Sequence, residues 1–179
     1  KIFNNGKLQM TGIPHPDLGK TAVTYVTKLL KELSMKGPEG KDIILSKKRV
    51  ELKNYKTVMI NSCYDIGFSI DRESLYNIIL NRYKLNTIFD SEGYPGVRIE
   101  YYYNNKNTGK ESEGRCVCPT KCKGKGTGKG LHNCRKISIA IFQSGSAIIA
   151  GGCSDQKPIF DAYNFINRIL SEIITEVYK

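Results

Sequence analysis

Two segments far apart in the chain carry the same short pattern. Residues 2–12 read Ile-Phe-Asn-Asn-Gly-Lys-Leu-Gln-Met-Thr-Gly, and residues 141–151 read Ile-Phe-Gln-Ser-Gly-Ser-Ala-Ile-Ile-Ala-Gly. Each predicts a strand, a tight turn and a second strand that ends at glycine. Asn5-Gly6 is a strong hairpin signal because both positions tolerate positive φ, and Ser144-Gly145 is a weaker version. Such a repeat constrains the 179-residue chain to contain two related units.

An amphipathic helix is predicted after each copy. Apolar residues recur there every three or four positions, which places them on one helix face. In the first copy they are Leu18, Ala22, Tyr25, Val26, Leu29 and Leu33, and in the second Ile159, Tyr163, Ile166, Leu170, Ile173 and Val177. Two hairpin-plus-helix units with similar apolar faces are expected to pack as a pseudo-two-fold pair.

The sequence between the two copies predicts further elements of the second repeat. These are a strand over 55–68, a helix over 72–83 capped by Asp71, a turn at Tyr94-Pro95-Gly96 and an alternating strand over 97–103. The first copy retains only the final hairpin and helix, so we expect N-terminal sequence to be missing. The predicted organisation is the rest of a first repeat (1–36), a linker (37–49) and a second repeat (50–179) with an insertion at 104–135.

The charge distribution indicates a polyanionic partner. Lys and Arg number 28 against 17 Asp and Glu, a net charge of +11, and residues 104–136 alone hold nine basic and two acidic residues. Nucleic acid is the commonest such partner, and a basic surface that serves only solubility is the alternative. No apolar run is long enough for a membrane-spanning helix. With two histidines and no nucleophile-base constellation, the sequence does not predict an enzyme.

The order of these elements resembles the TATA-box-binding protein family. The resemblance rests on the two hairpin motifs, the Tyr94-Pro95-Gly96 turn, Cys63-Tyr64-Asp65 and the helix positions. It implies an α+β fold in which a pseudo-two-fold pair of repeats forms a saddle of curved antiparallel sheet with helices on the convex face. The concave face of that sheet would bind the minor groove of double-stranded DNA.

The resemblance also implies which residues touch DNA. Aromatic wedges that unstack base steps match Phe3, Phe142 and Tyr94, the last with a hydroxyl that the family's wedge lacks. The remaining positions implied for the groove are Lys7, Thr11, Met59, Asn61, Ser144 and Ile148. Taken from the residues alone, the alternative is that Phe3 and Phe142 are core residues of their hairpins.

Several positions depart from the family pattern. The equivalents of Thr11 and Lys7 in the second copy are Ala150 and Ser146, and a usual arginine aligns with Glu100, which is expected to repel phosphate. Asp90 and Glu92 match an acidic loop that transcription factor IIB grips. A solvated loop tip is the alternative for this pair.

The insertion has no counterpart in the family. Cys116, Cys118, Cys122 and Cys134 have the residue type and proximity that suit tetrahedral zinc. Disulfide or redox pairing and free thiols are the alternatives. The run over 124–130 alternates glycine with Lys or Thr but lacks the Gly-Lys-Ser/Thr of a phosphate-binding loop, so we interpret it as a flexible basic tether.

Together these features predict a TATA-box-binding-like transcription initiation factor that acts through the minor groove. The partners implied are double-stranded DNA, a transcription factor IIB-like protein and the RNA polymerase machinery. The expected location is the nucleus, or a cytoplasmic site of viral transcription if a large DNA virus encodes the chain. The alternative is a protein-interaction or DNA-packaging scaffold that has lost TATA specificity.

Overall fold

The structure is a computed structural model that describes residues 1–179 except 33, 37–41, 45–49, 107–113, 117 and 121. It divides into two compact units, Lys1–Thr57 and Val58–Lys179. Most of the predicted linker at 37–49 and part of the predicted insertion lie outside the described residues. The predicted boundaries of the repeats remain predictions.

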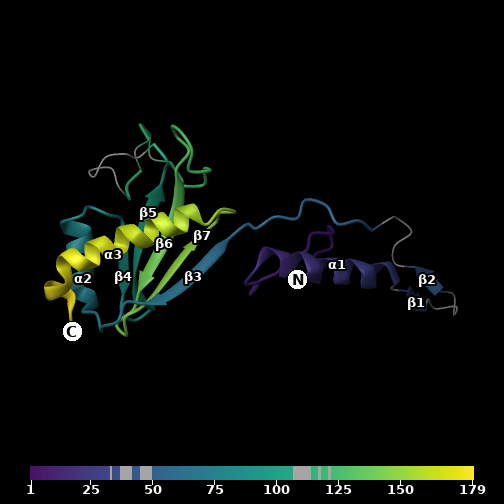
Figure 1. Ribbon diagram of the computed structural model, residues 1–179, viewed down its shortest axis with the longest axis horizontal. Coiled ribbons are helices and arrows are strands. Elements are labelled where there is room, and N and C mark those ends of the chain that lie inside the picture. Colours follow the sequence, from purple (N-terminus) through teal and green to yellow (C-terminus); the bar gives the residue numbers. More distant parts are fainter. Residues whose placement is uncertain (33, 37–41, 45–49, 107–113, 117, 121) are drawn as a thin grey trace. The chain divides into compact units, whose positions relative to one another are not determined.

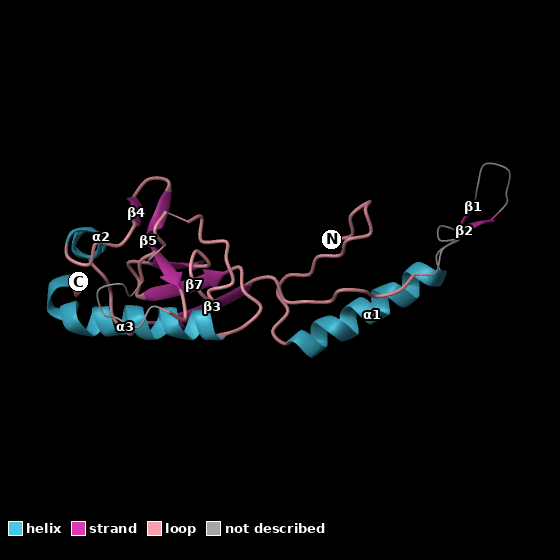
Figure 2. Ribbon diagram, turned by 90° about the horizontal axis from the view of Figure 1, so that it is seen from above, coloured by secondary structure: helices cyan, strands magenta, loops and turns pink. Residues whose placement is uncertain are grey.

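The second unit contains one antiparallel sheet and two helices. The strands are β3 (Ile60–Asp65), β4 (Thr87–Asp90), β5 (Tyr94–Tyr103), β6 (Arg135–Ile141) and β7 (Ser146–Gly151), in the spatial order β3-β7-β6-β5-β4. The helices are α2 (Arg72–Asn81) and α3 (Lys157–Val177). Helix α3 runs along one face of the sheet (Figures 1 and 2). The predicted α+β class is confirmed, whereas the pseudo-two-fold saddle stays a prediction.

The hydrophobic core lies between helix α3 and the sheet. Strand β5 alternates as the sequence predicts, with Val97 and Ile99 fully buried and Arg98 between them exposed. The predicted apolar face of α3 is confirmed at its buried members, which are Ile159, Ile166, Leu170, Ile173 and Val177. Tyr163 is the exception, because it is 41% exposed.

Helix α2 begins at the predicted cap. One carboxylate oxygen of Asp71 accepts hydrogen bonds from the backbone N–H groups of Glu73 (3.1 Å) and Ser74 (3.3 Å). The predicted strand over 55–68 is wrong in its length, because β3 covers only Ile60–Asp65. Its partner β7 offers only Ser146–Gly151 for pairing, and Gly67, at a φ of 93°, turns the chain after the strand.

The first unit has little core of its own. It contains α1 (Pro16–Glu32) and the short pair β1 (Ser34–Lys36) and β2 (Asp42–Ile44). Among the helix residues only Gly19 and Val23 are buried. In the predicted apolar face of this helix, Tyr25 is 63% exposed and Leu18 56% exposed, Val26 is half-buried, and Leu33 lies outside the described residues.

Candidate nucleic-acid interface and cysteine cluster

The sheet of the second unit has one face that the core does not use. Successive strand residues point to opposite faces, so the residues that alternate with the core residues share this second face. We call it the open face. Its members are Asn61, Cys63 and Asp65 of β3, Ile88 of β4, Arg98, Glu100 and Tyr102 of β5, Lys136, Ser138 and Ala140 of β6, and Ser146, Ile148 and Ala150 of β7.

Small side chains lie in the middle of the open face. The strand register places Ala150 between Asn61 and Ser138, and Ala140 between Ile148 and Arg98. Ala150 is half-buried, whereas Ala140 is only 6% exposed. The centre is thus a shallow apolar strip with polar side chains at its margins.

An aromatic pair stands at one end of the open face. The rings of Tyr94, at the start of β5, and Phe142, at the end of β6, have centroids 5.8 Å apart at an interplanar angle of 56°. Phe142 is half-buried and does not belong to the buried core. Gly96 allows the approach, because a Cβ there would lie 2.9 Å from the Tyr94 ring and 3.1 Å from the Phe142 ring. The guanidinium of Arg98 lies 5.3 Å from the Tyr94 ring centroid.

The other predicted DNA contacts of the second unit have distinct positions. Asn61 is exposed on β3, and Met59 is 63% exposed just before that strand. Ile148 is half-buried on β7. Ser144 lies in the β6–β7 turn, where its hydroxyl is 3.2 Å from that of Ser146. The structure therefore brings Asn61, Ile148 and the aromatic pair to one side of the sheet.

The remaining predicted DNA contacts belong to the first unit. Phe3, Lys7 and Thr11 are all exposed there. Phe3 is 43% exposed, so within its own unit it is not the buried hairpin residue of the alternative interpretation.

The predicted partner residues lie in the turn between β4 and β5. The Asp90 carboxylate accepts hydrogen bonds from the backbone N–H groups of Glu92 (3.1 Å) and Gly93 (3.0 Å). Asp90 thus shapes the turn, and both acidic residues are exposed.

Glu100 is compensated by three neighbours. Its carboxylate accepts hydrogen bonds from the Lys136 ammonium (2.6 Å), the Asn86 amide (2.6 Å) and the Tyr102 hydroxyl (3.2 Å). Burial raises the pKa of Glu100, but the bonds from Lys136 and Asn86 outweigh it and hold the pKa below its ordinary value. The carboxylate that we expected to repel phosphate is therefore paired with a cation on the same face.

Sequence reasoning did not single out Arg98 and Lys136 as cations of the open face. The alternation of β5 carried the signal for Arg98, since this residue is out of phase with the buried Val97 and Ile99. Lys136 ends a long basic stretch, so the sequence did not distinguish it from the other cations there. Only the pairing of β6 with β5 places it opposite Tyr102.

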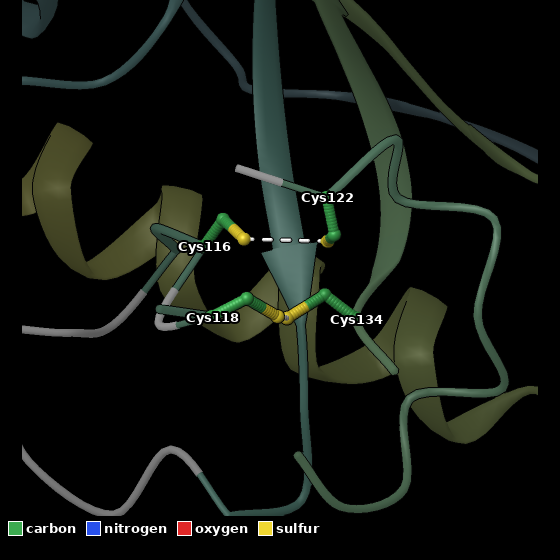
Figure 3. A group of neighbouring side chains, drawn as sticks. All are labelled: Cys116, Cys118, Cys122 and Cys134. Carbon is green, nitrogen blue, oxygen red and sulfur yellow. Dashed lines mark hydrogen bonds between the residues drawn. The ribbon is translucent and has the colours of Figure 1, made fainter. Parts of the chain in front are cut away.

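The four cysteines of the insertion form one cluster. The sulfur atoms of Cys116, Cys118, Cys122 and Cys134 all lie within 4.8 Å of one another. The Cys116–Cys122 and Cys118–Cys134 sulfur distances are 3.3 Å and 3.5 Å, and all four thiols are free (Figure 3). The predicted gathering of these residues is confirmed, and the group can hold a metal ion.

The geometry and chemistry of the cluster fit a tetrahedral thiolate site. Zinc–sulfur bonds of about 2.3 Å place sulfur atoms about 3.8 Å apart, within the range seen here. Burial raises the pKa of Cys116, but hydrogen bonds with Cys122 and Cys118 outweigh it and lower the pKa to about 7. Burial and thiol neighbours raise the pKa of Cys118 to about 12. A bound divalent cation favours the ionised form of all four.

The chain can be compared with models of protein families and with individual known proteins. No protein-family model matches it. A TATA-box-binding protein-like protein of Acanthamoeba polyphaga mimivirus is 30% identical over 179 residues, which is 99% of this chain and 44% of that protein. The chain thus spans less than half the length of this relative. The similarity confirms the resemblance drawn from the hairpin motifs and supports a divergent, TATA-box-binding protein-like chain.

Proposed function

We propose that the chain binds double-stranded DNA with the open face of its second unit and serves transcription initiation through the minor groove. The observation that carries this proposal is the aromatic pair at the end of a bare antiparallel face. The name of the mimivirus relative supports a DNA-binding role in transcription. In this proposal the protein acts by binding and has no catalytic role.

The open face has the groups that minor-groove binding requires. Tyr94 and Phe142 act as wedges that enter a base step, and the contact area gained by bending offsets the unstacking cost of a few kcal/mol. The small residues Ala140 and Ala150 let the groove floor approach the sheet. Arg98 provides a cation beside the wedges, and pyrimidine–purine steps are the least costly to open.

The proposed partners follow from the same resemblance. The exposed Asp90 and Glu92 form the acidic contact for a transcription factor IIB-like protein, which links the complex to RNA polymerase. The proposed location is the nucleus or a cytoplasmic site of viral transcription. No helix among the described residues is long and apolar enough to cross a membrane.

The cysteine cluster is proposed to hold one zinc ion. Its ligands are Cys116, Cys118, Cys122 and Cys134, and the ion supplies cross-links to a segment that buries few apolar groups. The Asn104 side chain donates to the Cys134 sulfur (3.5 Å) and to the Gly130 carbonyl (2.8 Å), and so orients one ligand.

A scaffold that has lost TATA specificity is the second candidate. Ala150, Ser146, Met59 and Glu100 favour it, because the family pattern has threonine, lysine, asparagine and arginine at these positions. A scaffold would bind duplexes of any sequence with equal affinity and would not bend them.

The decisive experiment replaces one wedge. Phe142→Ala is compared with Phe160→Ala, a matched control because Phe160 is exposed on α3. Loss of one stacking contact, worth roughly 1–3 kcal/mol, predicts at least a several-fold lower affinity for an A/T-rich duplex with TA steps. Energy transfer between dyes at the duplex ends should report a smaller bend.

Phe160→Ala should bind and bend DNA as the unmodified chain does. Equal affinity and equal bending for Phe142→Ala would refute the wedge role. Equal affinity of the unmodified chain for A/T-rich and G/C-rich duplexes would favour the scaffold.

A further inference from the structure

Gly124 and Gly128 of the run 124–130 pack against side chains of the sheet instead of leaving a loose tether. A Cβ at Gly124 would lie 2.5 Å from the Cβ of Lys136, and one at Gly128 would overlap the ring of Tyr103. Both have positive φ, 64° and 80°. Glycine is therefore required for close approach, and the interpretation of this run as a flexible tether is wrong.

Backbone hydrogen bonds hold the run along the start of β6. The Lys136 N–H donates to the Gly124 carbonyl (2.7 Å), and the Gly126 N–H donates to the Cys134 carbonyl (2.9 Å). The Asn105 N–H donates to the Gly128 carbonyl (2.8 Å). These bonds fix the run at both ends and in its middle.

The lysine side chains next to these glycines are directed to solvent. Lys123, Lys125 and Lys129 are all exposed, and we call these three residues the lysine comb. Within the described part of the chain, none of the three forms an ion pair with a carboxylate. The comb is thus a row of exposed cations on a hydrogen-bonded backbone.

The comb and the aromatic pair lie at opposite ends of the same strands. The insertion joins the end of β5 to the start of β6, whereas Tyr94 begins β5 and Phe142 follows β6 (Figure 1). A ten-residue strand spans roughly 30 Å at about 3.3 Å per residue. Gly124 packs beside Lys136 of the open face and Gly128 beside Tyr103 of the core face, so the run crosses the end of the sheet that is remote from the wedges.

We propose that the lysine comb binds the sugar–phosphate backbone of duplex DNA without reading its sequence. This inference rests on the proposed DNA binding by the open face and adds a second contact to it. Lysine binds phosphate as a point charge and needs no apolar surroundings. Protein partners instead need buried aromatic or aliphatic anchors, and the comb residues are all cationic.

The cysteine cluster anchors the comb. Cys122 precedes Lys123, and Cys134 lies beyond Lys129, so a metal held by both closes the segment that carries the three lysines. Metal binding then becomes a condition for the phosphate contact, because it limits the conformations open to the comb.

The test is the salt dependence of DNA affinity. Log affinity falls with log salt, and each lost phosphate contact reduces the magnitude of this slope by about 0.9. The triple variant K123A/K125A/K129A should therefore reduce the magnitude by about 2 to 3. The matched control is K157A/R168A/K179A, which removes the same charge from exposed positions on and just after α3. The control should keep the slope of the unmodified chain.

A second arm tests the anchor. Chelation of the metal should reduce the magnitude of the slope for the unmodified chain toward that of the comb variant. It should change the slope of the comb variant itself very little. A slope that chelation leaves unchanged would overturn the anchoring role.

The outcomes separate the two proposals. If the unmodified chain binds no duplex, DNA binding by the open face fails. If the unmodified chain binds and the comb variant keeps the control's slope, the comb proposal alone fails. Unchanged DNA binding with weaker binding of single-stranded RNA would also overturn the comb proposal, because it would assign the lysines to another nucleic acid.

Discussion

The two hairpins of the repeat have the same turn but different surroundings. In the first, the Phe3 N–H donates to the Lys7 carbonyl (2.9 Å) and the Gly6 N–H to the Phe3 carbonyl (3.0 Å). In the second, the equivalent bonds join Phe142 to Ser146 (2.9 Å) and Gly145 to Phe142 (3.0 Å). The turn geometry therefore follows from the local sequence in both copies.

The strands beside the turns differ. The first hairpin has a single bridge between Ile2 and Leu8 among the described residues, and Ile2 is 58% exposed. In the second, β7 pairs with both β3 and β6, and Ile141 is completely buried. A turn forms from its own residues, but a strand needs neighbours on its edges and a face to cover it.

The largest expected effect on stability comes from truncating Ile141, which occupies the same position in the second hairpin as Ile2 in the first. Ile141→Ala should lower the free energy of unfolding by about 2–5 kcal/mol, because it leaves a cavity in the core. Ile2→Ala should change it by less than about 0.5 kcal/mol, because that side chain is already exposed. Urea titrations followed by circular dichroism measure both, and equal losses would show that the first hairpin is buried as the second is.

Alanine substitutions at the turn glycines are expected to have smaller effects on stability, and they compare the same position in the two turns. Gly6 and Gly145 both have positive φ, 78° and 88°, so alanine at either carries a left-handed strain of about 1–2 kcal/mol. A Cβ at Gly145 would also overlap the Phe68 carbonyl, whereas one at Gly6 meets nothing within 4 Å.

We therefore expect Gly145→Ala to cost about 1 kcal/mol or more beyond Gly6→Ala in the same urea titrations. The backbone of Phe68 must shift to accept the methyl group. A cost at Gly6 equal to or above that at Gly145 would contradict the difference in surroundings.

The smallest expected effect on global stability comes from metal removal. The core beneath β6 and β7 is independent of the cysteine cluster, so chelation should leave the urea midpoint of the second hairpin's unit nearly unchanged. Backbone amides of residues 122–134 should exchange hydrogen faster, because the cross-links are lost. Elemental analysis should give one zinc per chain before chelation.

Cys134→Ser is the genetic form of the same test. It should reproduce the faster exchange over 122–134, while Cys63→Ser, a control on the open face, should not. Collapse of the whole unit on chelation would show that the second hairpin depends on the metal.

Features with a local or periodic origin were predictable from the sequence. The turn at Gly145 requires positive φ, Asp71 caps a helix through its own side chain, and Val97 and Ile99 alternate with Arg98 across the sheet plane. The gathering of the four cysteines was predictable because metal-ligating residues close in sequence need only a short loop to meet.

Tertiary structure decided the features that depend on distant neighbours. Helix α1 has a periodic apolar face, yet Leu18, Tyr25 and Leu29 of that face are exposed in the part of the first unit that the structure describes. Glu100 is neutralised by Lys136 only because β5 and β6 pair in one register. Gly124 and Gly128 are buried because Lys136 and Tyr103, on opposite faces of the paired strands β5 and β6, lie against them. Composition carries no record of such contacts, since they arise only when the strands pair.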